Sequence, residues 1–249
     1  MADAKRTGSA RRSAKSLVVI AFLAAFGSVA IGFIAGNRWV LPIANTILVY
    51  PFYIKLILAG ERRRAVALAL VWAIFMSEAM VAGTCLFPER AKAIVISGAE
   101  YKGEMFSWIS TGEGKESTPR EFIVEHAREF AIFAGVGIVT AGLGAIFMGA
   151  VLLNFMNFYV GALILASANP LATALVAWQP YAVVRVVGYI IFATALAEAS
   201  LGMATKWRAR WSRVVAYGTL GFALVALDVI IKWAIAPLWG KLLRMASGL

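Results

Sequence analysis

Long apolar segments follow one another along the first third of the chain and are separated by short charged stretches. They cover residues 17–34, 40–58 and 65–87. Each is close to the roughly 20 residues that a helix needs to cross a bilayer. The pattern therefore predicts three transmembrane helices within residues 17–87, preceded by a basic tail at residues 1–16.

The second half contains four further apolar segments, which we interpret as spans four to seven. They cover residues 130–153, 160–178, 180–204 and 214–238. Asn169-Pro170 interrupts the fifth segment, because the residue before a proline disfavours helical geometry. Residues 154–178 therefore form either a kinked span or two half-helices that re-enter the membrane. The four-span region extends over residues 129–240, and a short tail at 241–249 closes the chain.

One extended polar segment, residues 88–128, separates the two groups of spans. The sequence Thr118-Pro119-Arg120-Glu121 is typical of a helix start, with a capping Thr, an initial Pro and an acid near the positive helix end. We expect this helix to continue directly into the fourth span. The predicted fold class is all-α: a polytopic transmembrane bundle of about seven spans with one extracytoplasmic helical segment.

Composition and charge agree with a membrane protein. Of the 249 residues, 61% are hydrophobic and 15% are charged, whereas soluble domains are about half apolar and a quarter charged. The net charge of +11 comes from basic residues that gather at helix ends, which favours topology over nucleic-acid binding as its cause. The basic tail, residues 62–64 and residues 206–213 fall on one side of a seven-span bundle. The positive-inside rule places that side, with the N-terminus, in the cytoplasm of a multi-pass cell-membrane protein.

Few residues are suited to catalysis or metal binding. The chain has one cysteine, Cys85, and one histidine, His126. These exclude an intrachain disulfide, a His/Cys metal cluster and a haem held by two histidines of this chain. The sequence also lacks a phosphate-binding Gly-x-x-x-x-Gly-Lys loop and a Gly-x-Ser-x-Gly nucleophile elbow. We therefore expect no catalytic group, metal or cofactor, and we interpret His126 as a surface residue.

Small residues recur at every fourth position of the predicted fourth span. They are Gly137, Ala141, Ala145 and Gly149. A spacing of four residues places all of them on one face of a helix. In lipid, small residues let two helix backbones approach closely. We expect this face to pack either against another helix of the same chain or against a partner subunit.

We select six polar or charged residues within the predicted spans or at their ends as candidate functional positions, because such groups are costly in lipid. They are Glu78, Asn154, Asn157, Arg185, Asp228 and Lys232. Asp228 and Lys232 share a helix face, and antiparallel packing brings Arg185 to a similar depth. We expect Asp228 to offset one or both cations. The group is a structural ion pair, a polar path for an ion or anionic group, or a contact with a partner.

The other three intramembrane residues also have alternative interpretations. Glu78, beside Ser77 in the middle of the third span, is either a hydrogen-bonded structural carboxyl or a proton or cation site. Asn154 and Asn157 stand where the fourth span is predicted to end, and their amides need partners in lipid. We expect these amides to cap the helix or to bond across the following turn, with substrate binding as the alternative.

Two motifs in the second half resemble the stage II sporulation protein M family of membrane proteins. Gly-Leu-Gly at residues 142–144 leads to Asn157 and Gly161, similar to the small-residue-rich helix of that family. Residues 232–237 have the layout of the family's last helix, with Lys232 in place of its usual acid. The resemblance covers about half of the chain and implies a non-enzymatic component of a membrane complex.

Two functions are consistent with these features. We predict a non-catalytic integral membrane subunit of a larger complex, in which the small-residue face packs on partner subunits or on further copies of the chain. The alternative is a transporter or permease, because broken helices and polar residues near the midplane form the sites of such proteins. Neither function involves nucleic acid.

Overall fold

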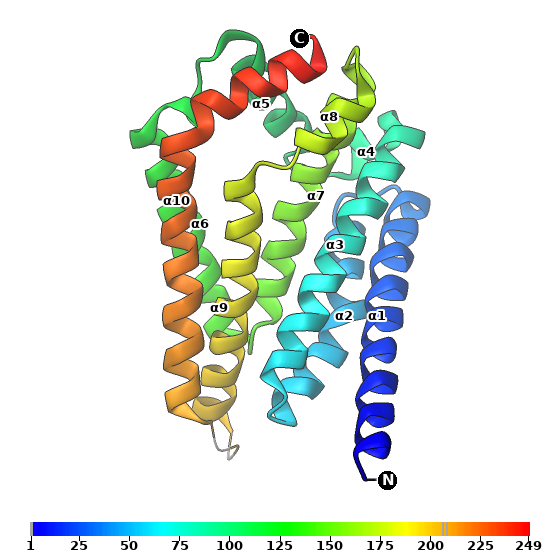
Figure 1. Ribbon diagram of the computed structural model, residues 1–249, viewed down its shortest axis with the longest axis vertical. Helices are drawn as coiled ribbons and strands as arrows, with labels where there is room; N and C mark the ends of the chain where they lie inside the picture. The colour runs from blue at the N-terminus through cyan, green and yellow to red at the C-terminus, as the bar shows by residue number, and fades with distance from the viewer. Residues whose placement is uncertain (1, 206, 208) are drawn as a thin grey trace.

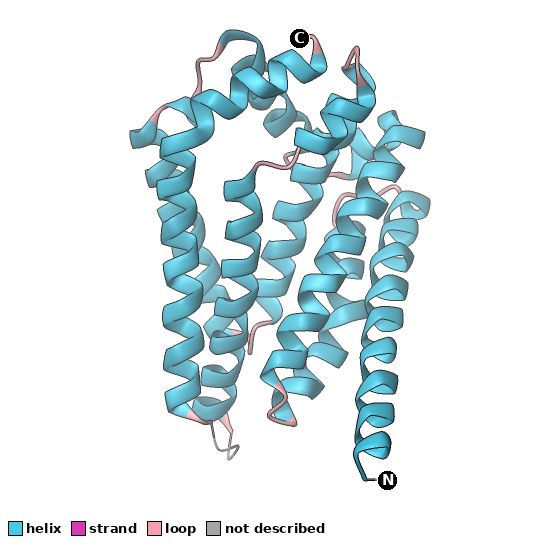
Figure 2. Cartoon of the chain, viewed as in Figure 1, coloured by secondary structure: helices cyan, strands magenta, loops and turns pink. Residues whose placement is uncertain are grey.

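The protein is almost entirely helical. A computed structural model describes residues 2–205, 207 and 209–249, with side chains from residue 15 onward. This described part contains ten α-helices and one short 3-10 helix, and no strand (Figure 2). The predicted all-α fold class is therefore confirmed.

The membrane-spanning helices form a bundle. Six helices of the described chain are long and apolar enough to cross a membrane, so this is a multi-pass membrane protein. They are α1 (Ala2–Ala35), α2 (Val40–Leu58), α3 (Arg62–Leu86), α7 (Leu143–Ala166), α9 (Pro180–Ala204) and α10 (Trp211–Ser247). A further helix, α6 (Pro119–Val139), packs against α7 and α9. Its first half is charged and its second half, residues 130–139, is apolar. With α6 the chain crosses the bundle seven times, the predicted number.

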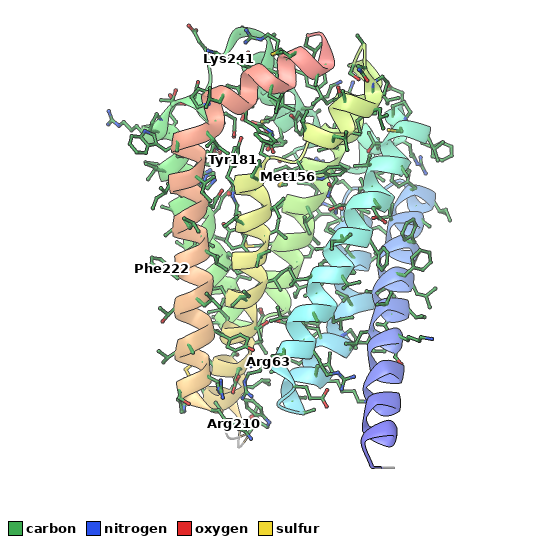
Figure 3. The ribbon with its side chains drawn as sticks, in the orientation of Figure 1. Arg63, Met156, Tyr181, Arg210, Phe222 and Lys241 are labelled. Carbon is green, nitrogen blue, oxygen red and sulfur yellow. The ribbon has the colours of Figure 1, made fainter. Side chains whose placement is uncertain are left out.

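The two ends of the bundle carry different elements (Figure 1). The N-terminus, the α2–α3 loop, the α6–α7 turn and the start of α10 lie toward one end, here called the N-terminal end. The opposite C-terminal end holds the C-terminus and the short helices α4 (Pro88–Ile94), α5 (Gly98–Thr111) and α8 (Pro170–Val176). Arg63 and Arg210 both lie at the N-terminal end (Figure 3). These two basic clusters therefore share an end, as the seven-span topology requires.

The predicted fourth span is two helices joined by a tight turn. Helix α6 ends at Val139 and α7 begins at Leu143. Between them, Ala141 and Gly142 have φ angles of 51° and 83°, the left-handed region that commonly ends helices and favours glycine. The N–H of Gly142 donates to the carbonyl oxygen of Gly137 at 2.8 Å, as in a Schellman helix end. The prediction of one helix over residues 130–153 is wrong.

The small residues consequently do not share one helix face, and that prediction is wrong as well. Gly137 lies in the last turn of α6, Ala141 lies in the turn between the helices, and Ala145 and Gly149 belong to α7. A Cβ atom on Gly137 would lie 3.1 Å from Cβ of Ala145 and 2.7 Å from Cδ1 of Leu196. Gly137 and Ala145 thus let α6, α7 and α9 approach one another within the chain.

Residues 154–178 also differ from the prediction. Helix α7 continues through Asn154 and ends at Ala166, so there is no turn near Asn154. The Asn169 side chain accepts a hydrogen bond from the Ala172 N–H at 3.2 Å and thereby caps the short helix α8. Figure 1 shows α8 at the C-terminal end of the bundle. The segment 154–178 is therefore the second half of α7 followed by the short helix α8, rather than one kinked span or two half-helices.

The C-terminal residues 241–249 are mostly helical, rather than a separate tail. Helix α10 contains Pro237 and bends across the C-terminal end of the bundle (Figure 1). Arg244 Nε donates to the carbonyl oxygen of Ile109 at 2.6 Å, and Ala168 N–H donates to the carbonyl oxygen of Ser247 at 2.8 Å. The end of α10 is therefore fixed to α5 and to the α7–α8 connection.

Helices α9 and α10 pack closely where a glycine faces the backbone of the other helix. A Cβ atom on Gly221 would lie 2.6 Å from the backbone nitrogen of Phe192 and 2.7 Å from its Cβ. These are positions that a real methyl group cannot occupy unless the backbones separate. The absence of a side chain at Gly221 therefore sets the distance between the two helices.

We predict that Gly221→Ala destabilises the bundle by about 1–3 kcal/mol, the usual cost of overpacking. Gly218→Ala on the same helix is the matched control, because its Cβ would lie 3.8 Å from that of Ala195, an ordinary contact. Alanine also favours a helix over glycine. Thermal unfolding of both variants in detergent measures the difference, and equal melting temperatures would contradict the close packing at Gly221.

Candidate functional site

A cavity of about 340 Å³ lies among α3, α5, α6, α7 and α9. Its lining has a charged part and an apolar part. The charged part includes Glu100, Glu104, Lys115, Glu116, Glu125, Arg128, Glu129 and Arg185. The apolar part includes Trp72, Phe133, Ala145, Ile146, Ile190 and Ala193. Tyr181 and Met156, which also line the cavity, lie toward the C-terminal end of the bundle (Figure 3). The cavity thus leads from the charged C-terminal end toward the middle of the bundle.

Two ion pairs organise the charged part. Arg185 donates from Nε to Oδ2 of Asp228 at 2.8 Å and from Nη2 to Oδ1 at 3.3 Å, so this pair is bidentate. Lys232 Nζ donates to Oε1 of Glu116 at 2.8 Å. The Tyr181 hydroxyl donates to the other oxygen of Glu116 at 3.2 Å. The two pairs connect α9, α10 and the loop that follows α5.

The predicted pairing of Asp228 is confirmed for Arg185 and not for Lys232. Lys232 is buried, and its Nζ lies 4.7 Å from the centroid of the Phe122 ring, so it also makes a cation–π contact. The sequence analysis did not identify Glu116 as its partner, because Glu116 lies in a loop far from α10 along the chain.

Two glycines in the loop before α6 allow this loop to turn, so that Glu116 reaches Lys232 on α10. Gly112 and Gly114 have φ angles of 81° and 142°, which L-residues rarely adopt. Between Gly114 and Thr118 the chain forms the 3-10 helix η1 (Lys115–Ser117). Lys115 Nζ donates to Oε1 of Glu104 on α5 at 2.6 Å, and this hydrogen bond raises the pKa of the Lys115 ammonium group. We call residues 112–118 the strap; η1 contacts α5, α6 and α10.

His126 is buried beside the Arg185–Asp228 pair, so its assignment to the surface is wrong. Its Nε2 lies 3.7 Å from Oδ2 of Asp228, too far for a hydrogen bond. Burial lowers the pKa of His126 to about 2, and the nearby charges of Arg185 and Lys232 act in the same direction. The imidazole is therefore neutral at physiological pH.

Asn154 and Asn157 are buried within α7, where they join helices and do not cap one. Asn154 Nδ2 donates to Oδ1 of Asn45 on α2 at 2.8 Å. Asn157 Nδ2 donates to Oγ of Ser77 on α3 at 2.9 Å, and its Oδ1 accepts from Nε1 of Trp178 at 3.0 Å. Hydrogen bonds of this kind hold membrane helices together. Both residues therefore serve the packing of α7 against α2 and α3.

Glu78 lies on the exposed face of α3 and outside the cavity. Ile74 and Ala82, each one turn away, are also exposed. The structure shows no ion pair between Glu78 and a described residue. Glu78 is thus not brought together with Arg185, Asp228 and Lys232.

Toward the N-terminal end, three contacts that the sequence analysis missed join the helices of the bundle. They are hydrogen bonds from Tyr50 to the carbonyl oxygen of Ala141 and between Tyr53 and Thr194, and the ion pair of Arg62 with Glu198. Arg62 and Glu198 are both buried and form two charge-assisted hydrogen bonds. These contacts join α2 and α3 to α9 and to the α6–α7 turn. The sequence analysis identified only the basic cluster at residues 62–64 and no partner for it.

Four residues in the cavity lining have buried side-chain polar atoms that lack a hydrogen-bond partner among the described residues. The atoms are the indole N–H of Trp72, the hydroxyl of Tyr189, the amide nitrogen of Gln179 and both ring nitrogens of His126. All four residues are buried, with Trp72 2% and Tyr189 5% exposed. Buried polar groups in proteins are normally paired. A molecule bound in the cavity is one way to pair them.

Within the described residues, no group of three or more His, Cys, Asp and Glu is placed to hold a metal ion.

Comparisons with known proteins do not assign this site. No family model, curated protein or solved structure matches the chain. The resemblance to the stage II sporulation protein M family stays a prediction from its two motifs. In this structure Gly161 of the first motif packs against α3, where an added Cβ would lie 2.7 Å from Cβ of Thr84.

We predict that replacing either Arg185 or Asp228 alone by alanine costs about 3–5 kcal/mol of folding free energy, because the remaining charge is buried without its partner. The double variant should lose less than the sum of the two single losses, because neighbouring partners are not independent. Unfolding in detergent measures all three variants beside the unaltered protein. Strictly additive losses would contradict a direct pair.

His126 is the only histidine, so its titration can be followed without ambiguity. We predict that 15N-histidine NMR of the folded protein shows a neutral ring from about pH 8 to about pH 5, because burial disfavours the imidazolium. The folded pKa lies below the unfolded value of about 6.5, so the unfolded chain binds the proton more readily and stability falls as the pH drops below about 6.5. A folded-state midpoint near pH 6.5 would show that the ring is accessible.

Proposed function

We propose that the protein is a membrane transporter or permease whose substrate occupies the cavity. The observation that carries this proposal is the division of the lining, with charged groups at the C-terminal end and apolar groups toward the middle of the bundle. Ligand pockets combine an apolar wall with a few placed polar groups and begin at about 300 Å³. Transporter sites lie near the middle of the membrane, between packed groups of helices.

Contacts toward the N-terminal end of the bundle support the same proposal. A transporter needs a barrier on one side of its substrate while the other side is open. Here the Arg62–Glu198 pair and the Tyr53–Thr194 hydrogen bond join α2 and α3 to α9. Separation of α9 from α2 and α3 would remove this barrier. We infer that these contacts form the inner gate.

We also propose that the N-terminal end faces the cytoplasm. Residues 62–64 and Arg210 carry positive charge at this end, and cytoplasmic loops are enriched in Lys and Arg. The cavity would then open toward the outside of the cell membrane.

Glu78 favours a second function, that of a subunit of a membrane complex. A carboxyl group on a lipid-facing helix is costly unless it finds a partner. Contact with another protein, or with a second copy of this chain, would supply one. The small-residue face that first suggested a subunit is not a single face in this fold, so Glu78 is the observation that supports this function.

Three glycines allow a direct test of access to the cavity. A Cβ atom would meet nothing within 4 Å at Gly149 in the cavity lining, at Gly135 on the exposed apolar part of α6 or at Gly103 on the exposed part of α5. Each is changed to cysteine in a Cys85→Ala background and exposed to a small membrane-impermeant thiol reagent in right-side-out vesicles.

We predict that the Gly103→Cys variant reacts fastest, that the Gly149→Cys variant reacts measurably and that the Gly135→Cys variant does not react. Gly103 lies at the aqueous end, Gly149 is reached through the cavity, and Gly135 faces lipid. If the Gly103→Cys variant reacts with the reagent and the Gly149→Cys variant does not, the proposed function is overturned. Reaction of the Gly103→Cys variant only in inverted vesicles would overturn the orientation alone.

A further inference from the structure

The cavity lining carries more acid than base. Its carboxylates are Glu100, Glu104, Glu116, Glu125 and Glu129, and its cations are Lys115, Arg128 and Arg185. Arg185 is already compensated by Asp228, which does not line the cavity. Lys115 pairs with Glu104, Arg128 with Glu125 and Lys232 with Glu116. Two carboxylates, Glu100 and Glu129, remain without an ion pair to any described residue.

Glu129 is the remaining carboxylate that lies deeper in the protein. Glu100 is exposed, whereas Glu129 is partly buried on α6. Phe133 lies one turn further along the same face of α6 and lines the apolar part. Its ring stacks on Tyr189 with centroids 4.5 Å apart. The Glu129 carboxylate therefore stands at the boundary between the charged and apolar parts of the cavity.

Aromatic rings surround the space beyond this carboxylate. Tyr101 and Phe155 line the cavity with ring centroids 4.7 Å apart, and the Phe133–Tyr189 stack and Trp72 line it as well. Aromatic faces attract organic cations and also pack against apolar groups. The unpartnered Trp72 N–H and Tyr189 hydroxyl, both more than nine-tenths buried, add hydrogen-bonding groups in the same lining.

We infer that the cavity takes an organic cation, with an ammonium group facing Glu129 and an apolar skeleton between the aromatic rings. A hydrogen-bond acceptor on the skeleton would meet the Trp72 N–H. This inference rests on the proposed function and names its substrate class. An organic anion would meet the unpaired carboxylates, and an inorganic cation would leave the apolar part of the cavity unfilled.

The Gly149→Cys variant tests this inference with two thiol reagents of opposite charge. The cationic reagent is trimethylammonium-ethyl methanethiosulfonate, and the anionic reagent is sulfonatoethyl methanethiosulfonate. Each rate is divided by the rate of the same reagent at the Gly103→Cys variant, which removes the intrinsic difference between the reagents. We expect the cationic reagent to be favoured in the cavity by about tenfold or more, because a cleft lined by one sign of charge concentrates the opposite sign.

Glu129→Gln removes the charge and keeps the shape of the side chain. We expect it to reduce the cationic preference several-fold in the Gly149→Cys background. Glu121→Gln is the matched control, because Glu121 is an exposed carboxylate on the same helix that does not line the cavity. Equal effects of the two substitutions would overturn the assignment of Glu129.

The outcomes separate this inference from the proposed function. Equal normalised rates for both reagents at the Gly149→Cys variant would contradict the inference that the substrate is an organic cation. They would still show that the cavity is accessible, so the proposed function would stand. No reaction with either reagent would overturn the proposed function itself. If Glu129→Gln does not fold, protection of the Gly149→Cys variant by tetraphenylphosphonium supports the inference with Glu129 unaltered. Equal protection by the anion of the same shape, tetraphenylborate, would overturn it.

Discussion

Charged side chains at the edge of an apolar layer must find partners within the protein, and this requirement organises the C-terminal end of the bundle. Arg185 on α9 and Lys232 on α10 bring two cations to the same region. Asp228 neutralises the first, and Glu116 reaches the second only because the glycines of the strap let it turn inward. The position of the strap, and with it the charged lining of the cavity, depends on this pairing.

The same constraint acts on neutral polar groups inside the bundle. The Asn45–Asn154 and Ser77–Asn157 hydrogen bonds connect α7 to α2 and α3. In hydrocarbon these amides have no water to bind, so they fix the register of the helices that carry them. Helix α7 is therefore held on one side, while its other side, which carries Gly149, is free to line the cavity.

Hydropathy alone predicted the helical class and the approximate limits of the first three spans and of the sixth, because lipid demands about 20 apolar residues per crossing. Residue spacing and antiparallel topology predicted the Arg185–Asp228 pair. The α6–α7 turn was missed because the segment Thr140-Ala141-Gly142 carries no charge, and only the glycine marks the helix end. The contacts Lys232–Glu116 and Arg62–Glu198 join residues more than 100 positions apart. Such pairs follow from three-dimensional packing, which no local pattern in one sequence reports.

The pairing of α10 has a consequence for the synthesis of the chain. Proteins are made from the N-terminus, so Glu116 and Arg185 enter the membrane region before the helix that carries their partners exists. Until α10 inserts, Glu116 and Arg185 of the nascent protein have no ion-pair partner on that helix. The last helix to emerge from the ribosome thus supplies the ion-pair partners of two charged residues that were synthesised earlier. An unfinished chain should be recognisable to membrane quality control by these two exposed groups.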